Sequence, residues 1–173
     1  MLQEMDIKLE PMSELELTEY QTSAPAVYAE SLKEGGVYPD EECLKIARES
    51  FKKHLPEGVR TPGHTFFVVK KVSSETSRPQ VGTSNEIRIG SVWLGIREEQ
   101  GKKSAYIYDI FLDEPFRGQG FGRLTLEKIE EAVNQLGLNR IGLHVFGHNL
   151  HARALYEKMG YQTKSIVMEK VLA

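Results

Sequence analysis

The first third of the chain changes from an alternating pattern to two helical ones. Residues 7–10 alternate apolar and polar side chains, which predicts a short strand. Ser13, followed three residues later by Glu16, is typical of a capping box, so we expect a helix from there to the glycine pair at 35–36. Apolar residues at helical spacing predict a second helix over residues 40–55.

The middle of the chain is typical of an antiparallel sheet. Three runs are rich in β-branched and aromatic residues, and polar loops at residues 73–85 and 98–103 separate them. Such an arrangement predicts three consecutive strands joined as a meander. The runs are His64–Val72, Glu86–Arg97 and Ser104–Leu112.

After Leu112 the pattern alternates between helix and strand. We expect helices over 119–136 and 149–159, and strands over 140–146 and 161–172. With the preceding elements, this order predicts an α/β fold of the α+β type, a mixed sheet with helices on both faces.

Composition limits the class of protein. A chain of 173 residues favours one domain over residues 1–173, and 40% apolar with 27% charged residues is ordinary for a globular fold. No apolar run approaches the ~20 residues that span a bilayer, and the start lacks a signal peptide's basic and apolar regions. Cys43 is the single cysteine, which excludes an internal disulfide and a zinc cluster. We therefore expect a cytoplasmic protein that uses no metal and no membrane.

Charge is unevenly distributed. The net charge of −3 does not favour a general nucleic-acid binder. Residues 1–50 hold 12 acidic and 4 basic side chains, whereas residues 51–173 hold 13 acidic and 18 basic ones. The imbalance indicates either a cationic ligand at one end and an anionic one at the other, or helix faces exposed to water.

The segment 112–122 carries the strongest chemical signal. A predicted strand ends there and an amphipathic helix begins within three alternating glycines, Gly118, Gly120 and Gly122. Glycines let backbone N–H groups approach an anion, the helix N-terminus favours negative charge, and Arg117 adds a cation. These features predict a pyrophosphate cradle; the alternative is a tight turn with no ligand.

Two common phosphate motifs do not fit this segment. The Walker pattern needs Lys-Ser or Lys-Thr after its last glycine, where this chain has Arg123 and Leu124. The dinucleotide-binding fingerprint has a different glycine spacing and an acid about 20 residues downstream, where this chain has none.

The spacing Arg117-x-x-Gly120-x-Gly122 resembles the acetyl-CoA signature of the GNAT family of N-acetyltransferases. Asn149-x-x-Ala152-x-x-x-Tyr156, continuing to Gly160-Tyr161, resembles the second motif of that family. The resemblance covers nearly the whole chain, and residues 143–149 resemble the bacterial YycN-like group within the family. Only 13 residues follow Gly160, which leaves room for one strand or a very tight pair where many members have two.

This resemblance implies a central mixed, largely antiparallel sheet that splays between its fourth and fifth strands, with acetyl-CoA lying in the gap. Backbone groups of Ile110 and Leu112 are then expected to bind pantetheine, and the Leu112 N–H to polarise the thioester carbonyl. The full set implied for acetyl-CoA binding is Ile110, Phe111, Leu112, Arg117, Gly118, Gln119, Gly120, Phe121, Gly122, Asn149, Ala152 and Tyr156.

Three residues are candidates for proton transfer. Tyr156 is the implied acid for the departing thiolate, or else an aromatic packed under its helix. Asp109 and His144 are candidate bases for the amine; the alternatives are an aspartate bound to a helix on the other face and a core histidine. Asn149 either caps its helix, binds pantetheine, or does both.

The sequence as a whole predicts an acetyl-CoA-dependent N-acetyltransferase acting by direct transfer to a primary amine in a ternary complex. The acceptor is expected to be a cationic small molecule or peptide, and the protein a monomer or homodimer that binds neither nucleic acid nor membrane. The alternative function is an acyl-CoA-binding regulatory module without turnover.

Overall fold

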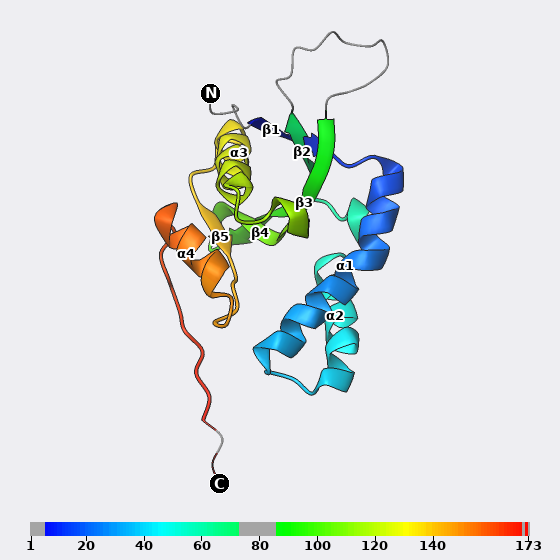
Figure 1. The fold of residues 1–173 in the computed structure, drawn as a ribbon, viewed down its shortest axis with the longest axis vertical. Helices are drawn as coiled ribbons and strands as arrows, with labels where there is room; N and C mark the ends of the chain where they lie inside the picture. Colours follow the sequence, from blue (N-terminus) through cyan, green and yellow to red (C-terminus); the bar gives the residue numbers. More distant parts are fainter. Residues whose placement is uncertain (1–5, 73–85, 171, 173) are drawn as a thin grey trace.

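The computed structural model describes residues 6–72, 86–170 and 172 of the chain. Five strands form one sheet, and α-helices lie on both of its faces (Figure 1). In chain order the elements are β1 (Asp6–Pro11), α1 (Glu14–Gly35), α2 (Asp40–His54), η1 (Gly58–Arg60), β2 (His64–Val72), β3 (Glu86–Glu99), β4 (Lys102–Leu112), η2 (Glu114–Phe116), α3 (Phe121–Gln135), β5 (Ile141–Leu143) and α4 (Leu150–Lys158).

The strand order β1-β2-β3-β4-β5 follows the chain. The first three pairings are antiparallel, and the last, between β4 and β5, is parallel. This is the mixed, largely antiparallel sheet that the sequence predicted. Parallel neighbouring strands need a crossover connection, and α3 forms the connection between β4 and β5.

Each face of the sheet has its own core. On one face, α3 buries Phe121, Leu126, Ile129 and Val133 against strand residues. On the other face, Tyr20 and Ala24 of α1 pack over the sheet, and α1 also packs against α2. The strand residues buried under α3 are Ile7, Val69, Ile89, Val92, Leu94 and Ile107, and those buried under α1 include Phe66, Val68 and Trp93.

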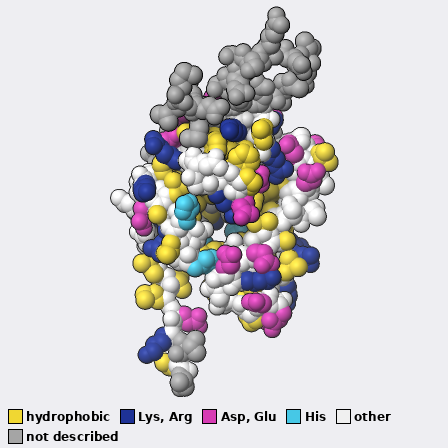
Figure 2. All heavy atoms as spheres, in the orientation of Figure 1, with side chains coloured by type: hydrophobic (Ala, Val, Ile, Leu, Met, Phe, Trp, Pro, Cys, Tyr) yellow, Lys and Arg dark blue, Asp and Glu magenta, His cyan; other side chains and the backbone are white. Residues whose placement is uncertain are grey.

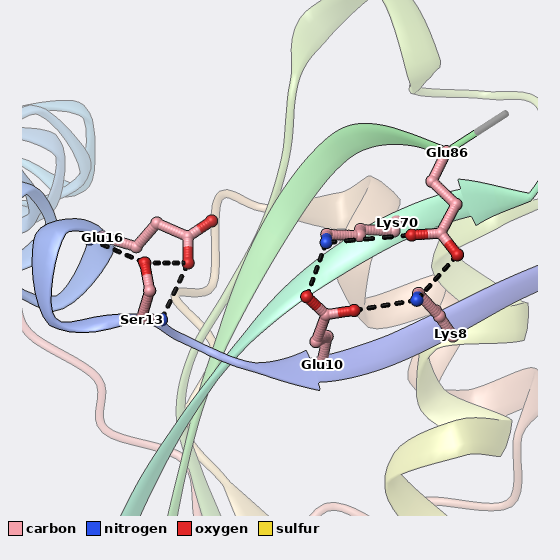
Figure 3. A network of polar contacts seen from close by, with 6 residues as sticks. All are labelled: Lys8, Glu10, Ser13, Glu16, Lys70 and Glu86. Carbon is pink, nitrogen blue, oxygen red and sulfur yellow. Dashed lines mark hydrogen bonds and ion pairs between the residues drawn. The ribbon is translucent and has the colours of Figure 1, made fainter. Parts of the chain in front are cut away.

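The start of α1 confirms the predicted capping box. The Ser13 hydroxyl accepts a hydrogen bond from the Glu16 N–H at 3.4 Å, and Glu16 Oε2 accepts one from the Ser13 N–H at 2.8 Å (Figure 3). The helix ends at Gly36, whose φ of +62° is the left-handed geometry that glycine adopts readily. Local sequence signals therefore set both ends of this helix.

Four charged side chains join the first three strands at the sheet edge (Figure 3). Lys8 Nζ lies 2.8 Å from Glu10 and 2.7 Å from Glu86, and Lys70 Nζ lies 2.6 Å from Glu10. Lys70 and Lys8 lower the pKa of Glu10 to about 2. These ion pairs connect β1 to β2 and β3, and as exposed pairs each contributes little to stability.

Two predictions about strands are wrong in detail. The predicted loop at 98–103 is a two-residue turn, because Gln100 and Gly101 both have positive φ (52° and 73°) and let β3 and β4 continue to either side. The predicted strand over 140–146 is shorter, since pairing with β4 stops at Leu143. The other predicted loop, 73–85, lies outside the described residues.

The predicted final strand over 161–172 does not form in the described part of that segment. Residues 162–170 are exposed and belong to no strand, and Figure 1 shows this segment running away from the body after α4. The residues have strand-forming composition, but a strand also needs a neighbouring strand, and this segment pairs with none of the five.

Candidate active site

The gap between β4 and β5 is where the expected site lies. Only three residue pairs join the two strands, from Ala105–Ile141 to Ile107–Leu143. Beyond them the chain leaves β5, whereas β4 continues to Leu112. The sheet therefore splays between its fourth and fifth strands, as the sequence predicted.

Backbone groups of β4 point into this gap. The Asp113 N–H donates to the Ile89 carbonyl, on the β3 side. Because successive peptide groups of a strand face opposite edges, the N–H groups of Leu112 and Ile110 face the β5 side. Their side chains pack at the margin of the core under α3. The Leu112 N–H and the Ile110 carbonyl thus remain available at the gap, because the Ile110 N–H is hydrogen-bonded to the Asp109 carboxylate.

An irregularity in β4 redirects the side chains at this point. Trp93 of β3 is opposite Asp109 and its neighbour Leu94 is opposite Ile107, so Tyr108 is an extra residue in the strand. A bulge of this kind reverses the alternation of faces. Ile107 packs under α3, and Tyr108 stacks on Trp93 on the α1 face with ring centres 4.6 Å apart.

Asp109 also faces α1 because of this bulge. The Tyr20 hydroxyl of α1 donates a hydrogen bond to Asp109 Oδ2 at 2.9 Å. Burial raises the pKa of Asp109, while the Tyr20 hydroxyl and the Ile110 N–H oppose that rise by hydrogen bonding to the charged form. The carboxylate is thus a base of increased proton affinity held by a tyrosine that sequence reasoning did not identify.

The start of α3 has the geometry expected of an anion cradle. Gly118 and Gly120 have φ of +71° and +91°, values that favour glycine. Gly120 occupies the N-cap position, and no side chain of the described residues caps the first turn. Its N–H groups therefore remain available to a negatively charged group.

Two side chains hold the loop before α3. Arg117 Nε donates to the Leu112 carbonyl at 2.8 Å, and its guanidinium lies 5.1 Å from the centre of the Phe111 ring. Gln119 Nε2 donates to the Pro115 carbonyl at 2.6 Å. Arg117 is exposed, so its charge lies at the surface beside the end of β4.

The third glycine and its neighbour serve packing. A Cβ on Gly122 would lie 3.0 Å from Leu155 Cδ2, so the absence of a side chain lets α3 approach α4. Phe121 is buried in the core with 1% of its surface exposed. At these two positions the side chain, or its absence, serves the packing of α3, and only the backbone can face a ligand.

The second motif forms α4 as predicted. Asn149 Oδ1 accepts a hydrogen bond from the Ala152 N–H at 3.1 Å, which confirms that Asn149 caps this helix. Tyr156 lies on the inner face, with 9% of its surface exposed and its ring 5.6 Å from that of Tyr161. Burial, and then the charge of Asp109, raise the pKa of Tyr156 to about 12. The phenol therefore keeps its proton at neutral pH.

His144 lies just beyond β5 and is exposed, so its interpretation as a core histidine is wrong. It lines an open hollow of about 600 Å³ together with Leu143, Val145 and Tyr156. Two of the three candidates for proton transfer thus share one hollow, and Asp109 influences Tyr156 electrostatically.

One acidic residue of α1, Glu34, lies near His148, which follows β5. His148 Nε2 lies 3.6 Å from Glu34 Oε2, and Figure 2 shows histidine and acidic side chains side by side on the face it draws. Tyr28 of α1 also stacks on Phe146, with ring centres 6.2 Å apart. The acidic N-terminal third therefore reaches the surroundings of the candidate site.

No helix in 6–72 or 86–170 is long and apolar enough to cross a membrane. Within the same ranges, no group of three or more His, Cys, Asp or Glu side chains is arranged to hold a metal ion.

Comparison with known proteins agrees with this geometry. Residues 26–161 match the acetyltransferase (GNAT) family. The chain is 32% identical to the uncharacterised N-acetyltransferase YycN of Bacillus subtilis over 97% of this chain and 100% of YycN. The crystal structure of YycN superposes with a TM-score of 0.83, over 97% of this chain and 99% of that one.

Two other relatives differ in how much of the chain they match. The B. subtilis N-acetyltransferase YdgE is 30% identical over 97% of this chain and 99% of YdgE. L-ornithine N5-acetyltransferase NATA1 of Arabidopsis thaliana is 41% identical over a shorter stretch, 35% of this chain and 27% of that protein. Fold, motifs and relatives together show that the chain belongs to the GNAT family of acetyltransferases.

Proposed function

We propose that this protein transfers an acetyl group from acetyl-CoA to a primary amine by direct attack within a ternary complex. One observation carries the proposal. The open edge of β4 and the uncapped start of α3 lie at the two ends of one short loop, residues 113–120. A ligand with a peptide-like arm and a pyrophosphate can use both at once.

The residues present fit acetyl-CoA. The N–H groups at the start of α3, after Gly118 and Gly120, would bind the pyrophosphate, and Arg117 would add charge from the loop. Ile110 and Leu112 would pair with the pantetheine arm through their backbone groups. Acetyl-CoA supplies the acetyl thioester, so the protein has to orient it and move protons.

Three groups of this chain would act on the reacting atoms. The Leu112 N–H donates to the carbonyl oxygen as negative charge develops there. Asp109, or His144 through water, accepts the proton of the attacking amine. Tyr156 donates a hydrogen bond to the sulfur as its bond to carbon breaks, and the thiolate that leaves takes its proton from water. Cys43 has no exposed surface and packs between α1 and α2, which disfavours an acetyl-cysteine step.

The pKa of Tyr156 bears on whether its phenol transfers a proton to the leaving sulfur or only donates a hydrogen bond to it. A phenol with a pKa of about 12 gives up its proton less readily than a thiol, whose pKa is near 8.5, so complete transfer to a thiolate would be unfavourable. A hydrogen bond to the charged sulfur carries no such cost. We therefore assign Tyr156 mainly to stabilising the leaving sulfur.

A cationic acceptor fits the charges near the site. Glu30 and Glu34 lie on α1, whose residue Tyr20 also contacts Asp109. The partial match to an L-ornithine N5-acetyltransferase supports an acceptor with a free side-chain amine. A cytoplasmic location and a single domain over residues 1–173 belong to the same proposal.

A panel of amines incubated with acetyl-CoA, with free thiol as the readout, tests the proposal. The panel should include ornithine, lysine, polyamines, aminoglycosides and peptide N-termini, and at least one should give turnover above hydrolysis. If CoA binds tightly by calorimetry and no amine is acetylated, the chain is instead an acyl-CoA-binding regulatory module.

A further inference from the structure

Arg97 lies among aromatic side chains on the α1 face of β3 and β4. Its guanidinium lies 3.2 Å from the centre of the Tyr106 ring and 4.8 Å from the centre of the Tyr108 ring. Its Nε donates a hydrogen bond to the Tyr108 hydroxyl at 3.0 Å. Two tyrosines therefore fix the position and the plane of this cation.

The charge of Arg97 has no counterion in the part of the chain that the structure describes. The side chain is half-buried, and no described Asp or Glu forms an ion pair with it. The rings of His54 and His64 lie 5.0 and 5.1 Å from that of Tyr108. Burial, and then nearby positive charge that includes Arg97, lower the pKa of both histidines, so neither adds charge at neutral pH. The terminal nitrogens of Arg97 are thus donors suited to an anion from outside the chain.

Glycines on both neighbouring strands make room for this cluster. Gly95 of β3 and Gly142 of β5 are the residues opposite Tyr106. A Cβ on Gly95 would lie 2.6 Å from Tyr108 Cε2, and one on Gly142 would lie 3.2 Å from Tyr106 Cδ2. The absence of both side chains lets the two rings lie close over the sheet, where they hold Arg97.

The two tyrosines connect Arg97 to the candidate base. Asp109 follows Tyr108 and faces the same side of the sheet, where Tyr20 of α1 hydrogen-bonds to its carboxylate. Tyr106 belongs to one of the residue pairs that join β4 to β5 next to the gap. A ligand that lies along this part of β4 would have a fixed cation at one end and a carboxylate at the other.

We propose that Arg97 binds the carboxylate of the acceptor, and that the acceptor is a free amino acid with an amine on its side chain. The side-chain amine lies at Asp109, and the α-carboxylate accepts hydrogen bonds from the terminal nitrogens of Arg97. This inference rests on the proposed function and names the substrate class for the same site.

The charge of Arg97 also distinguishes between the classes of amine. Polyamines and aminoglycosides carry only positive charge, so Arg97 would repel their second ammonium group. A diamino acid places its carboxylate there instead and is still cationic overall, because its ammonium groups outnumber its carboxylate. The acidic residues of α1 and the cation on β3 are therefore compatible with one acceptor.

Matched pairs of acceptors test the proposal. Putrescine is ornithine without its carboxylate, and cadaverine is lysine without its carboxylate. The wild-type protein should prefer each amino acid to its diamine by about 10- to 100-fold in kcat/KM, the range expected of hydrogen bonds between charged groups. Arg97→Gln should remove this preference without lowering kcat/KM for the diamines. Arg88→Gln, at an exposed position of the same strand, is the matched control and should keep the preference.

Two results would overturn the proposal. One is equal kcat/KM for the amino acids and their diamines in the wild type, and the other is a preference that survives Arg97→Gln. If that variant is unfolded by circular dichroism, lysinamide replaces it as the test, because it is lysine with a neutral amide in place of the carboxylate. Lysinamide should be a poorer acceptor than lysine by the same factor, and equal kcat/KM rejects the proposal.

Calorimetry separates this proposal from the proposed function. Ornithine and putrescine are titrated into the CoA-bound protein, which requires no turnover. If no amine is acetylated but ornithine binds more tightly than putrescine, the proposed function fails and the carboxylate site stands. If the two bind equally, or neither binds, the carboxylate site is rejected whether or not other amines are acetylated.

Discussion

The two helices that begin beside the splayed strands start in opposite ways. At α4, the Asn149 side chain accepts a hydrogen bond from the Ala152 N–H and satisfies the first turn within the chain. At α3, the N-cap is Gly120, and no described side chain caps the turn. Both helices begin shortly after a strand of the same pair, β4 or β5.

This difference separates binding from chemistry. An uncapped helix start loses stability and gains a place for an anion, so α3 is suited to hold a pyrophosphate. A capped start makes α4 a stable support for the residue it presents, Tyr156, seven positions after the cap. The comparison predicts that changes at α3 affect affinity for CoA and that changes on α4 affect rate or stability.

The largest effect is expected at Tyr156. Tyr156→Phe removes one hydroxyl and almost no volume, so packing should survive. A positioned acid contributes roughly 10²–10⁴-fold, and the raised pKa of Tyr156 places our expectation at about 10²-fold in kcat, with unchanged CoA affinity. Steady-state kinetics and calorimetry on one preparation measure both. Wild-type kcat would remove the phenol from the mechanism, and lost CoA binding would make it structural.

The base can be identified by its pH dependence. The pKa of Asp109 is raised, so activity that needs its charged form should fall on acidification at a higher pH than for an ordinary aspartate. Asp109→Asn should then lower kcat/KM by roughly 10-fold to 10²-fold and abolish that acidic limb. His144→Gln is the matched variant, and the pH–rate profile shows which of the two matters. If neither changes the profile, the amine reaches the site already deprotonated.

Replacing Asp109 should affect thermal stability differently from activity. Because its folded-state pKa is raised above the unfolded value, the carboxylic acid form is the one that folding favours. The contribution of Asp109 to folding stability is complete below its pKa in the unfolded chain, and it is lost as the pH rises through its pKa in the folded protein. At neutral pH, Asp109→Asn should therefore not lower Tm, although it lowers activity.

A smaller effect is expected for Gly120→Val. The backbone there has a φ of +91°, which costs a β-branched residue about 1–3 kcal/mol, and the side chain would crowd the approaching phosphates. CoA affinity should fall about 10- to 100-fold. Calorimetric titration measures this, with circular dichroism to confirm the fold. Unchanged affinity would mean that the phosphates bind elsewhere.

The smallest effect is expected at the capped helix. Asn149→Ala removes the hydrogen bond to Ala152 and should cost about 1 kcal/mol in unfolding free energy, with Asn149→Asp as a variant that keeps a cap. Urea unfolding gives that number. A simultaneous loss of CoA affinity in the alanine variant would show that Asn149 binds pantetheine as well as capping α4.

Local signals in the sequence predicted most of the fold. The capping box at Ser13, the cap at Asn149 and the glycines at 118 and 120 all act within a few residues, so spacing alone identifies them. Strand runs and helix faces follow from side-chain periodicity in the same way.

The surroundings of the candidate base could not be predicted, because they depend on distant parts of the chain. Tyr20 reaches Asp109 only after α1 packs on the sheet, 89 positions away in sequence. The bulge at Tyr108 is defined by its partner strand, and without it Asp109 would face the same side as Ile107. The prediction of a strand over residues 161–172 was wrong for a related reason, since composition favours an extended segment but does not specify the neighbouring strand with which it pairs.

The indole of Trp93 makes the intrinsic fluorescence of the protein sensitive to the surroundings of this site. It is the only tryptophan of the chain, lies opposite Asp109, and donates its N–H to His64 Nδ1 at 2.9 Å. Burial lowers the pKa of His64, which keeps the ring neutral and able to accept that hydrogen bond. Fluorescence emission of the unlabelled protein therefore reports on the bulge directly. It should respond when an acceptor occupies the neighbouring site, and again in mild acid when His64 gains a proton and can no longer accept.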